Sequence, residues 1–186
     1  MFDLTHFREL TLTSHQADRI LAIIRSQDDI GIYLRTHLLI EQSLEAWIIC
    51  ASGNRNFFSG FGENINMDFA VKAQLAMNYG MSPELNKFIR KFNNFRNKRS
   101  HQIDNSDITS SEIDSLTGLI ERGYPDRLVP VRDFRLGVFE GENRVVRFSE
   151  SSTSLRDKLI MLFAMFSMRV HYEAECLNTS QSQALL

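Results

Sequence analysis

Arg96, Asn97 and His101 lie within one short basic segment of the sequence, RNKRSH. Histidine is the side chain that titrates near neutral pH, so it can take up or release a proton during a reaction. Arginine keeps its charge and can contact phosphate oxygens through two parallel N–H groups. This segment is therefore the best candidate in the chain for a site that acts on a phosphate group.

Positive charge is concentrated around this segment. Residues 87–99 include six basic side chains and no acidic one, although the whole chain has a formal net charge of −2. The overall charge excludes a generally basic nucleic-acid-binding surface but not a local basic patch. One interpretation is a solvated helix face, which the helix dipole favours near a C-terminus; the other is a groove for a phosphate backbone. The basic residues are Lys87, Arg90, Lys91, Arg96, Lys98 and Arg99.

The predicted position of Arg96 is unusual for a solvent-facing arginine. In a helix that begins near Ser82, a rotation of about 100° per residue places Arg96 in the same narrow arc as three apolar residues. These are Leu85, Ile89 and Phe92. A buried guanidinium needs a partner, and the candidates are Glu41 and Glu45, one turn apart on an earlier helix. A structural ion pair between two helices is thus one possible role for Arg96.

The same helix has a polar stripe. Asn93, Asn97 and His101 recur at intervals of four residues and so share one side of it. Arg96 and His101 are about 140° apart on an ideal helix. We expect them to meet only if the helix loosens near its end, if Arg96 reaches round it, or if a second copy of the chain supplies the complementary half.

The periodicity of apolar residues predicts an all-α fold. Helices are expected from about Ser14 onward and over about 28–52, 69–79, 82–101, 109–121 and 153–176. The stretch 123–149 contains two prolines and then alternates apolar and polar residues around a Gly-Glu-Asn turn, which predicts a β-hairpin insertion. The tail, 178–186, is expected to be frayed. The prediction is one domain over 1–186, a helical bundle of about five or six helices with a small hairpin.

Several other function classes are not expected. The chain has no CxxC, HxxxH or HExxH pattern, so we expect no metal and no other cofactor. Cys50 and Cys176 fall in apolar helical stretches and are expected to be buried thiols. No signal-peptide pattern is visible at the start, and the longest apolar stretch, 159–168, is too short to span a bilayer. A cytoplasmic location is therefore the expectation.

The segment RNKRSH resembles the R-x4-6-H motif of the HEPN superfamily, including the asparagine that directly follows the arginine in many of its nucleases. The context is also similar, because the motif follows an apolar helix and precedes a turn and a capped helix. The stretch FAVKAQLAMNYGMSPELNKFIRKFNNFRNKRSHQI resembles HEPN-like proteins of the mannitol-operon-repressor type. The resemblance covers about residues 29–120 and does not include the hairpin.

The resemblance implies a metal-independent endoribonuclease, often a homodimer with both motifs facing one cleft. His101 would be the general acid and base, Arg96 would stabilise the charge on phosphorus, and Asn97 would orient the 2′-hydroxyl or a phosphate oxygen. Flanking phosphates of the RNA would be held by Lys87, Lys91, Lys98 and Arg99. Such a protein would act as a toxin or defence effector, with an antitoxin or regulatory protein as partner. The alternative is a non-catalytic regulator or adaptor of the mannitol-repressor kind, in which Arg96 is structural.

Overall fold

The part of the chain that the structure describes contains seven α-helices, one short 3-10 helix (Val131–Asp133) and two short antiparallel hairpins. The structure is a computed structural model that describes residues 1–26, 28–60, 63–64, 66–100, 107–138 and 144–183. The helices are α1 (Leu4–Thr11), α2 (Ser14–Ile24), α3 (Asp29–Ser52), α4 (Phe69–Asn78), α5 (Pro83–Ser100), α6 (Ser110–Glu121) and α7 (Leu155–Gln183). The strands are β1 (Ser59–Gly60), β2 (Glu63–Asn64), β3 (Arg135–Val138) and β4 (Arg144–Arg147). This architecture confirms the predicted all-α bundle with a small hairpin.

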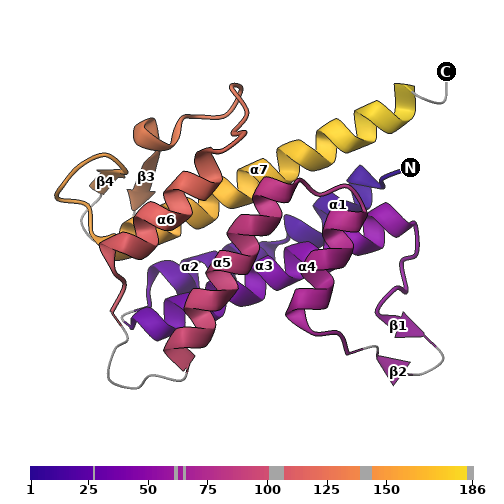
Figure 1. Cartoon of the computed structure of the whole chain (residues 1–186), viewed down its shortest axis with the longest axis horizontal. Helices are drawn as coiled ribbons and strands as arrows, with labels where there is room; N and C mark the ends of the chain where they lie inside the picture. The colour runs from indigo at the N-terminus through magenta and orange to yellow at the C-terminus, as the bar shows by residue number, and fades with distance from the viewer. Residues whose placement is uncertain (27, 61–62, 65, 101–106, 139–143, 184–186) are drawn as a thin grey trace.

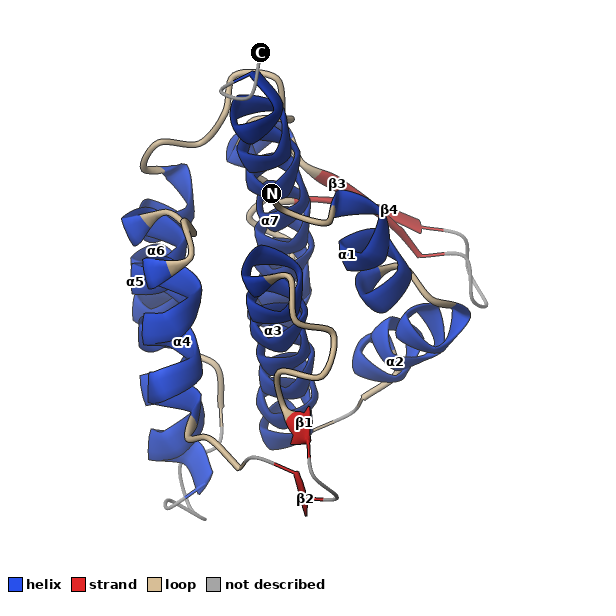
Figure 2. Ribbon diagram, turned by 90° about the vertical axis from the view of Figure 1, so that its right-hand side faces the viewer, coloured by secondary structure: helices blue, strands red, loops and turns tan. Residues whose placement is uncertain are grey.

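Helix α3 lies at the centre of the bundle and packs against α1, α2, α4, α5 and α7. In Figure 2, α4, α5 and α6 lie on one side of α3 and α7, and α1 and α2 lie on the other. Helix α5 also packs against α6, and α6 packs against α7. Helix α5 is therefore packed against α3, α4 and α6 (Figure 1).

Local sequence signals explain where the main helices begin and end. The Asp28 side chain caps α3 by accepting a hydrogen bond from the backbone N–H of Gly31. Thr109 and Glu112 form a reciprocal capping box at the start of α6. Helix α3 ends at Gly53, which has a φ of 69°. Glycine adopts this left-handed conformation without the steric cost that a Cβ atom brings.

Helix α1 was not among the predicted helices. Its sequence, LTHFRELT, has few apolar residues and is too short to be stable by itself. It is stabilised by tertiary packing, since the rings of Phe2 and Phe7 lie 5.0 and 6.0 Å from that of Trp47 in α3. All three side chains are at most 1% exposed.

The C-terminal part of the chain confirms one prediction and corrects two. The hairpin is present, with Leu136 of β3 opposite Val146 of β4. The tail is not frayed from residue 178, because α7 continues to Gln183. Cys50 is buried as expected, but Cys176 is exposed, since it lies on the outer side of α7. Within the described ranges, no helix has both the length and the apolar character needed to cross a membrane.

Candidate functional site

The candidate site lies at the C-terminal end of α5, where a buried apolar face changes to polar side chains. Leu85, Ile89 and Phe92 are at most 1% exposed. The ring of Phe92 lies 5.3 Å from that of Tyr33 in α3. Aromatic packing of this kind holds the helix in one rotation about its axis. The orientation of α5 is therefore set one turn before Arg96.

The structure brings two of the three motif residues together. Nη1 of Arg96 donates a hydrogen bond to Oδ1 of Asn97 at 2.9 Å, and both residues are half-buried. Ser100 is the last residue of α5, and the next residue, His101, lies outside the described residues. The described half of the motif is thus a permanently charged guanidinium held by an amide at the end of a helix.

A second histidine lies close to this end of α5. Nε2 of His37, on α3, is 2.9 Å from Oδ1 of Asn93, one turn before Arg96 and Asn97. The imidazole stacks on the ring of Phe69 at 4.2 Å and the residue is only 4% exposed. His37 is therefore a hydrogen-bonded core histidine, as its position on the apolar side of α3 predicts. Its contact with Asn93 was not predicted.

The environment of His37 favours the neutral imidazole. Burial is the main reason that the pKa of His37 lies below its usual 6.5, and the charges of Arg96 and Lys72 act in the same direction. The hydrogen bond with Asn93 and the charge of Glu41 oppose this shift without reversing it. Protonation of His37 is therefore less favourable in the folded protein than in the unfolded chain.

This difference predicts that acid destabilises the fold through His37. Because the folded pKa is lower than the unfolded one, the unfolded chain binds the extra proton first as the pH falls below about 6.5. The free energy of unfolding should then fall with a slope of at most about 1.4 kcal/mol per pH unit from this residue. Urea unfolding between about pH 7.5 and pH 5 should show a steeper loss for the wild type than for His37→Gln. Equal slopes in the two proteins would show that His37 is not responsible.

The predicted pairing of Arg96 with Glu41 and Glu45 is corrected by the structure. Both carboxylates instead accept hydrogen bonds from the ammonium group of Lys72, at 2.7 and 2.5 Å. The positions at which α4 and α5 cross α3 explain why Lys72, and not Arg96, pairs with these carboxylates. Lys72 is on α4, which packs along α3 beside these carboxylates, whereas α5 approaches α3 at His37, one turn earlier. Burial acts to lower the pKa of Lys72, but the two hydrogen bonds raise it above 10.5, so the lysine remains charged.

The expected role of Arg99 in holding RNA is wrong, because Arg99 is only 4% exposed. Its Nη1 donates a hydrogen bond to Oε1 of Glu112 at 2.6 Å, and its Nη2 donates to Oε2 of the same carboxylate. The guanidinium also lies 4.4 Å from the ring of Tyr33. Residues seven apart lie on nearly the same side of a helix, so Arg99 extends the buried face two turns beyond Phe92. Arg99 and Glu112 therefore form a buried structural ion pair between α5 and α6.

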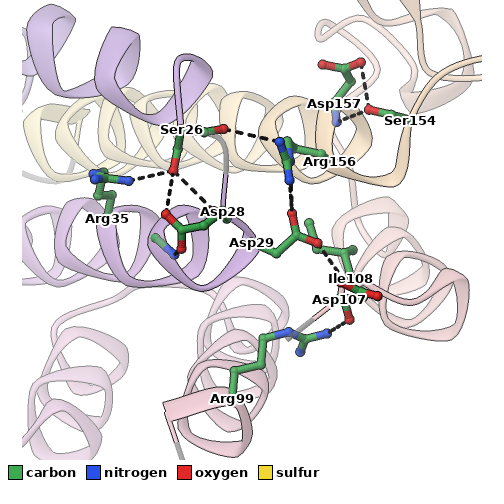
Figure 3. Close-up of polar contacts among 11 residues, drawn as sticks. Ser26, Asp28, Asp29, Arg35, Arg99, Asp107, Ile108, Ser154, Arg156 and Asp157 are labelled. Carbon is green, nitrogen blue, oxygen red and sulfur yellow. Dashed lines mark hydrogen bonds and ion pairs between the residues drawn. The ribbon is translucent and has the colours of Figure 1, made fainter. Parts of the chain in front are cut away.

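The chain on both sides of the loop between α5 and α6 is anchored by polar contacts (Figure 3). Nη2 of Arg99 donates a hydrogen bond to the carbonyl oxygen of Asp107 at 2.6 Å. The backbone N–H of Ile108 donates to Oδ2 of Asp29 at 2.9 Å. The other oxygen of Asp29 accepts from Arg156 of α7 at 2.7 Å. Helices α3 and α7 therefore position the end of α5 and the start of α6 relative to each other.

The remaining basic residues of α5 lie at the surface. Lys87 and Lys91 line an open groove of about 520 Å³ between α5 and α6. Lys98 is exposed near the end of the same helix. These positions are accessible to a phosphate backbone, and contact with RNA stays a prediction. In the ranges that the structure describes, no group of three or more His, Cys, Asp or Glu side chains is arranged to hold a metal ion.

A scan of known protein families found no match to this chain, and neither curated proteins nor solved structures gave one. The chemistry available to the site therefore follows from its own side chains. In the described residues, these are a guanidinium and an amide in contact, a neutral histidine beside them, and exposed lysines along the same helix.

Proposed function

We propose that the protein is a metal-independent endoribonuclease of the HEPN type. The observation that carries this proposal is the hydrogen-bonded pair of Arg96 and Asn97 at the end of α5, followed in the sequence by His101. Arg96 is half-buried rather than enclosed by Glu41 and Glu45, whose ammonium partner is Lys72. The charge of Arg96 is therefore not held by the carboxylates expected to bury it.

The proposed reaction uses a nucleophile that RNA itself provides. The 2′-oxygen attacks the adjacent phosphorus atom, and the bond from phosphorus to the 5′-oxygen of the next nucleotide breaks. His101 removes the proton of the 2′-hydroxyl, and a protonated imidazole gives a proton to the leaving 5′-oxygen. The products are a 2′,3′-cyclic phosphate and a free 5′-hydroxyl. Arg96 stabilises the negative charge that builds up on the phosphate oxygens, and Asn97 orients the hydroxyl or a phosphate oxygen.

This reaction needs one group that removes a proton and one that donates it. In a homodimer whose two motifs face one cleft, the histidine of each copy would fill one of these roles. We therefore propose a dimer as the active form. A protein that cuts cellular RNA in this way would suit a toxin or defence effector, controlled by an antitoxin or another regulatory protein.

Cleavage of single-stranded RNA in the presence of a metal chelator tests this proposal. The wild type should generate cyclic phosphate ends, and His101→Ala should cut about 10²–10⁴-fold more slowly, because the proton transfer is lost. Circular dichroism and the Tm should be measured for both proteins, so that a folding defect is recognised. If the wild type leaves RNA intact, or if His101→Ala cuts at the wild-type rate, the proposal is wrong.

A second candidate function, a non-catalytic regulator or adaptor, is favoured by a different surface. Leu34 and Leu38 of α3 are 36% and 61% exposed, and Leu38 lines an open groove of about 560 Å³ between α2 and α3. Exposed apolar surface of this kind is often where a protein partner binds. If RNA stays intact while Leu38→Glu abolishes the function of the protein in its host cell, the regulator replaces the nuclease as the best candidate.

A further inference from the structure

The groove between α5 and α6 gathers basic side chains from both helices. On α5 it is lined by Lys87, Arg90, Lys91 and Asn94, whose spacing of three and four residues places them on one face. On α6 it is lined by Asp114, Ser115, Gly118 and Leu119, and Arg122 follows at the end of that helix. The two helices pack against each other along their length (Figure 1). The groove therefore combines side chains of two helices that are separate in the sequence.

The groove is strongly positive in a chain that is negative overall. Four cations and one carboxylate line it, a net charge of +3, whereas the whole chain has −2. Among the residues that the structure describes, none of the four cations forms an ion pair that would neutralise it. Arg90 is held by the neutral side chains of Asn86 and Gln74, at 2.7 and 2.9 Å. Its guanidinium is therefore oriented by neutral partners on α5 and α4 and keeps its charge.

We propose that this groove binds the phosphate backbone of single-stranded RNA. The strand is the substrate of the proposed nuclease, so this inference rests on the proposed function. Lys98 lies seven residues after Lys91 on nearly the same face of α5 and about 10 Å farther along its axis. The line of cations therefore continues along this face to the last turn of the helix, whereas Arg96 lies about 160° round the helix from Lys98.

The lining of the groove also indicates how RNA is recognised. The described residues that line the groove include no aromatic side chain, and the ring of Phe95 lies beside it, 5.0 Å from Nζ of Lys91. Its ligands are cations and the neutral hydrogen-bonding side chains of Asn94 and Ser115, which suit phosphate and ribose oxygens. Recognition is therefore independent of sequence. An acidic protein partner is less well suited, because protein interfaces depend on buried aromatic or aliphatic anchors, and among the described residues of the lining Leu119 is the single apolar side chain.

Gly118 provides a way to block the groove without disturbing the helix. A Cβ atom placed on Gly118 would meet nothing within 4 Å. Gly118→Ala should therefore be tolerated, and should stabilise α6 by up to about 1 kcal/mol. Gly118→Glu adds a carboxylate to the positive groove and should weaken RNA binding, which makes the alanine variant its matched control.

The test uses a 2′-O-methyl RNA oligonucleotide, which cannot be cleaved because its nucleophilic hydroxyl is blocked. Binding can therefore be measured on proteins that keep Arg96, Asn97 and His101 unchanged. Lys87→Glu/Lys91→Glu and Gly118→Glu should each raise the Kd at least about tenfold. Lys87→Ala/Lys91→Ala should reduce the slope of log Kd against log salt concentration by about 1.4, since each lost phosphate contact changes it by about 0.7. Gly118→Ala should bind as the wild type does. A control with the same change in charge is Arg132→Glu/Arg135→Glu, at two exposed arginines outside the groove.

The outcomes separate this inference from the proposed function. If the groove variants weaken binding while the wild type does not cut RNA, the groove is a nucleic-acid site and the nuclease proposal fails. If cleavage depends on His101 but the groove and control variants bind equally, the inference is overturned and the nuclease stands. Binding of a polyglutamate peptide with the affinity and variant dependence seen for RNA would identify an acidic protein as the occupant and also overturn it.

Discussion

Arg99→Met is expected to lower the free energy of unfolding by about 3–5 kcal/mol, which is the usual cost of leaving one charge of a buried ion pair without its partner. Arg99 and Glu112 are both buried, with 4% and 7% of the surface of the whole residue exposed. The methionine fills much of the space of the arginine, so the loss comes mainly from the uncompensated carboxylate. The carbonyl oxygen of Asp107 loses a hydrogen bond in the same variant. Urea denaturation near pH 7 measures the change.

A second substitution distinguishes the buried charge from a packing defect. Glu112→Gln removes the charge but leaves an amide that accepts the backbone hydrogen bond of Thr109, so the capping box of α6 is kept. Arg99→Met/Glu112→Gln should therefore be more stable than Arg99→Met alone. A double variant that is no more stable than the single one would contradict the assignment of the loss to an unpaired carboxylate.

The same ion pair makes a prediction about acid. Burial raises the pKa of Glu112, but the hydrogen bonds and charge of Arg99, together with the hydrogen bonds from Thr109, outweigh burial, so the pKa lies below its ordinary 4.5. The carboxylate is thus stabilised in the folded state. Its contribution to stability is fully present above the unfolded pKa and is lost as the pH falls through the lower, folded pKa. In Glu112→Gln this part of the acid sensitivity should be absent.

Arg96→Ala is expected to reduce kcat for RNA cleavage by about 10²–10³-fold, the effect typical of removing one group that stabilises charge in a transition state. The guanidinium is already oriented by Asn97, so little further ordering is needed when the substrate binds. Arg96→Lys should recover only part of the activity, because an ammonium group keeps the charge but not the paired N–H geometry. The measurement is kcat and KM, determined separately, for all three proteins.

The split between the two kinetic constants decides the role of Arg96. A change in kcat with little change in KM indicates stabilisation of the transition state, whereas a change in KM alone indicates that Arg96 merely anchors the substrate. The second result would remove Arg96 from the catalytic group while leaving RNA as the ligand. Thermal unfolding of each variant is a necessary control, because Arg96 is half-buried.

Most of the secondary structure could be predicted because its signals are local. Asp28 and Gly53 bound α3, Pro83 begins α5, and Thr109 with Glu112 begins α6, all as expected from the sequence. Each signal depends on residues within one or two turns of the helix end. Helix α1 could not be predicted in this way, because its stability comes from contacts of Phe2 and Phe7 with Trp47, which is 45 and 40 residues away, respectively.

The sequence by itself determined that α5 has an apolar face with arginines at its end and a basic, polar remainder. It did not determine which arginine is buried. Arg96 and Arg99 are about 60° apart and both lie in the apolar arc of the helix, so periodicity alone cannot separate them. The tertiary structure decided this, because α6 places Glu112 beside Arg99 and α4 places Lys72 beside the carboxylates expected for Arg96. A helix pattern specifies which side is buried, whereas the partner of each buried charge depends on which helices cross there.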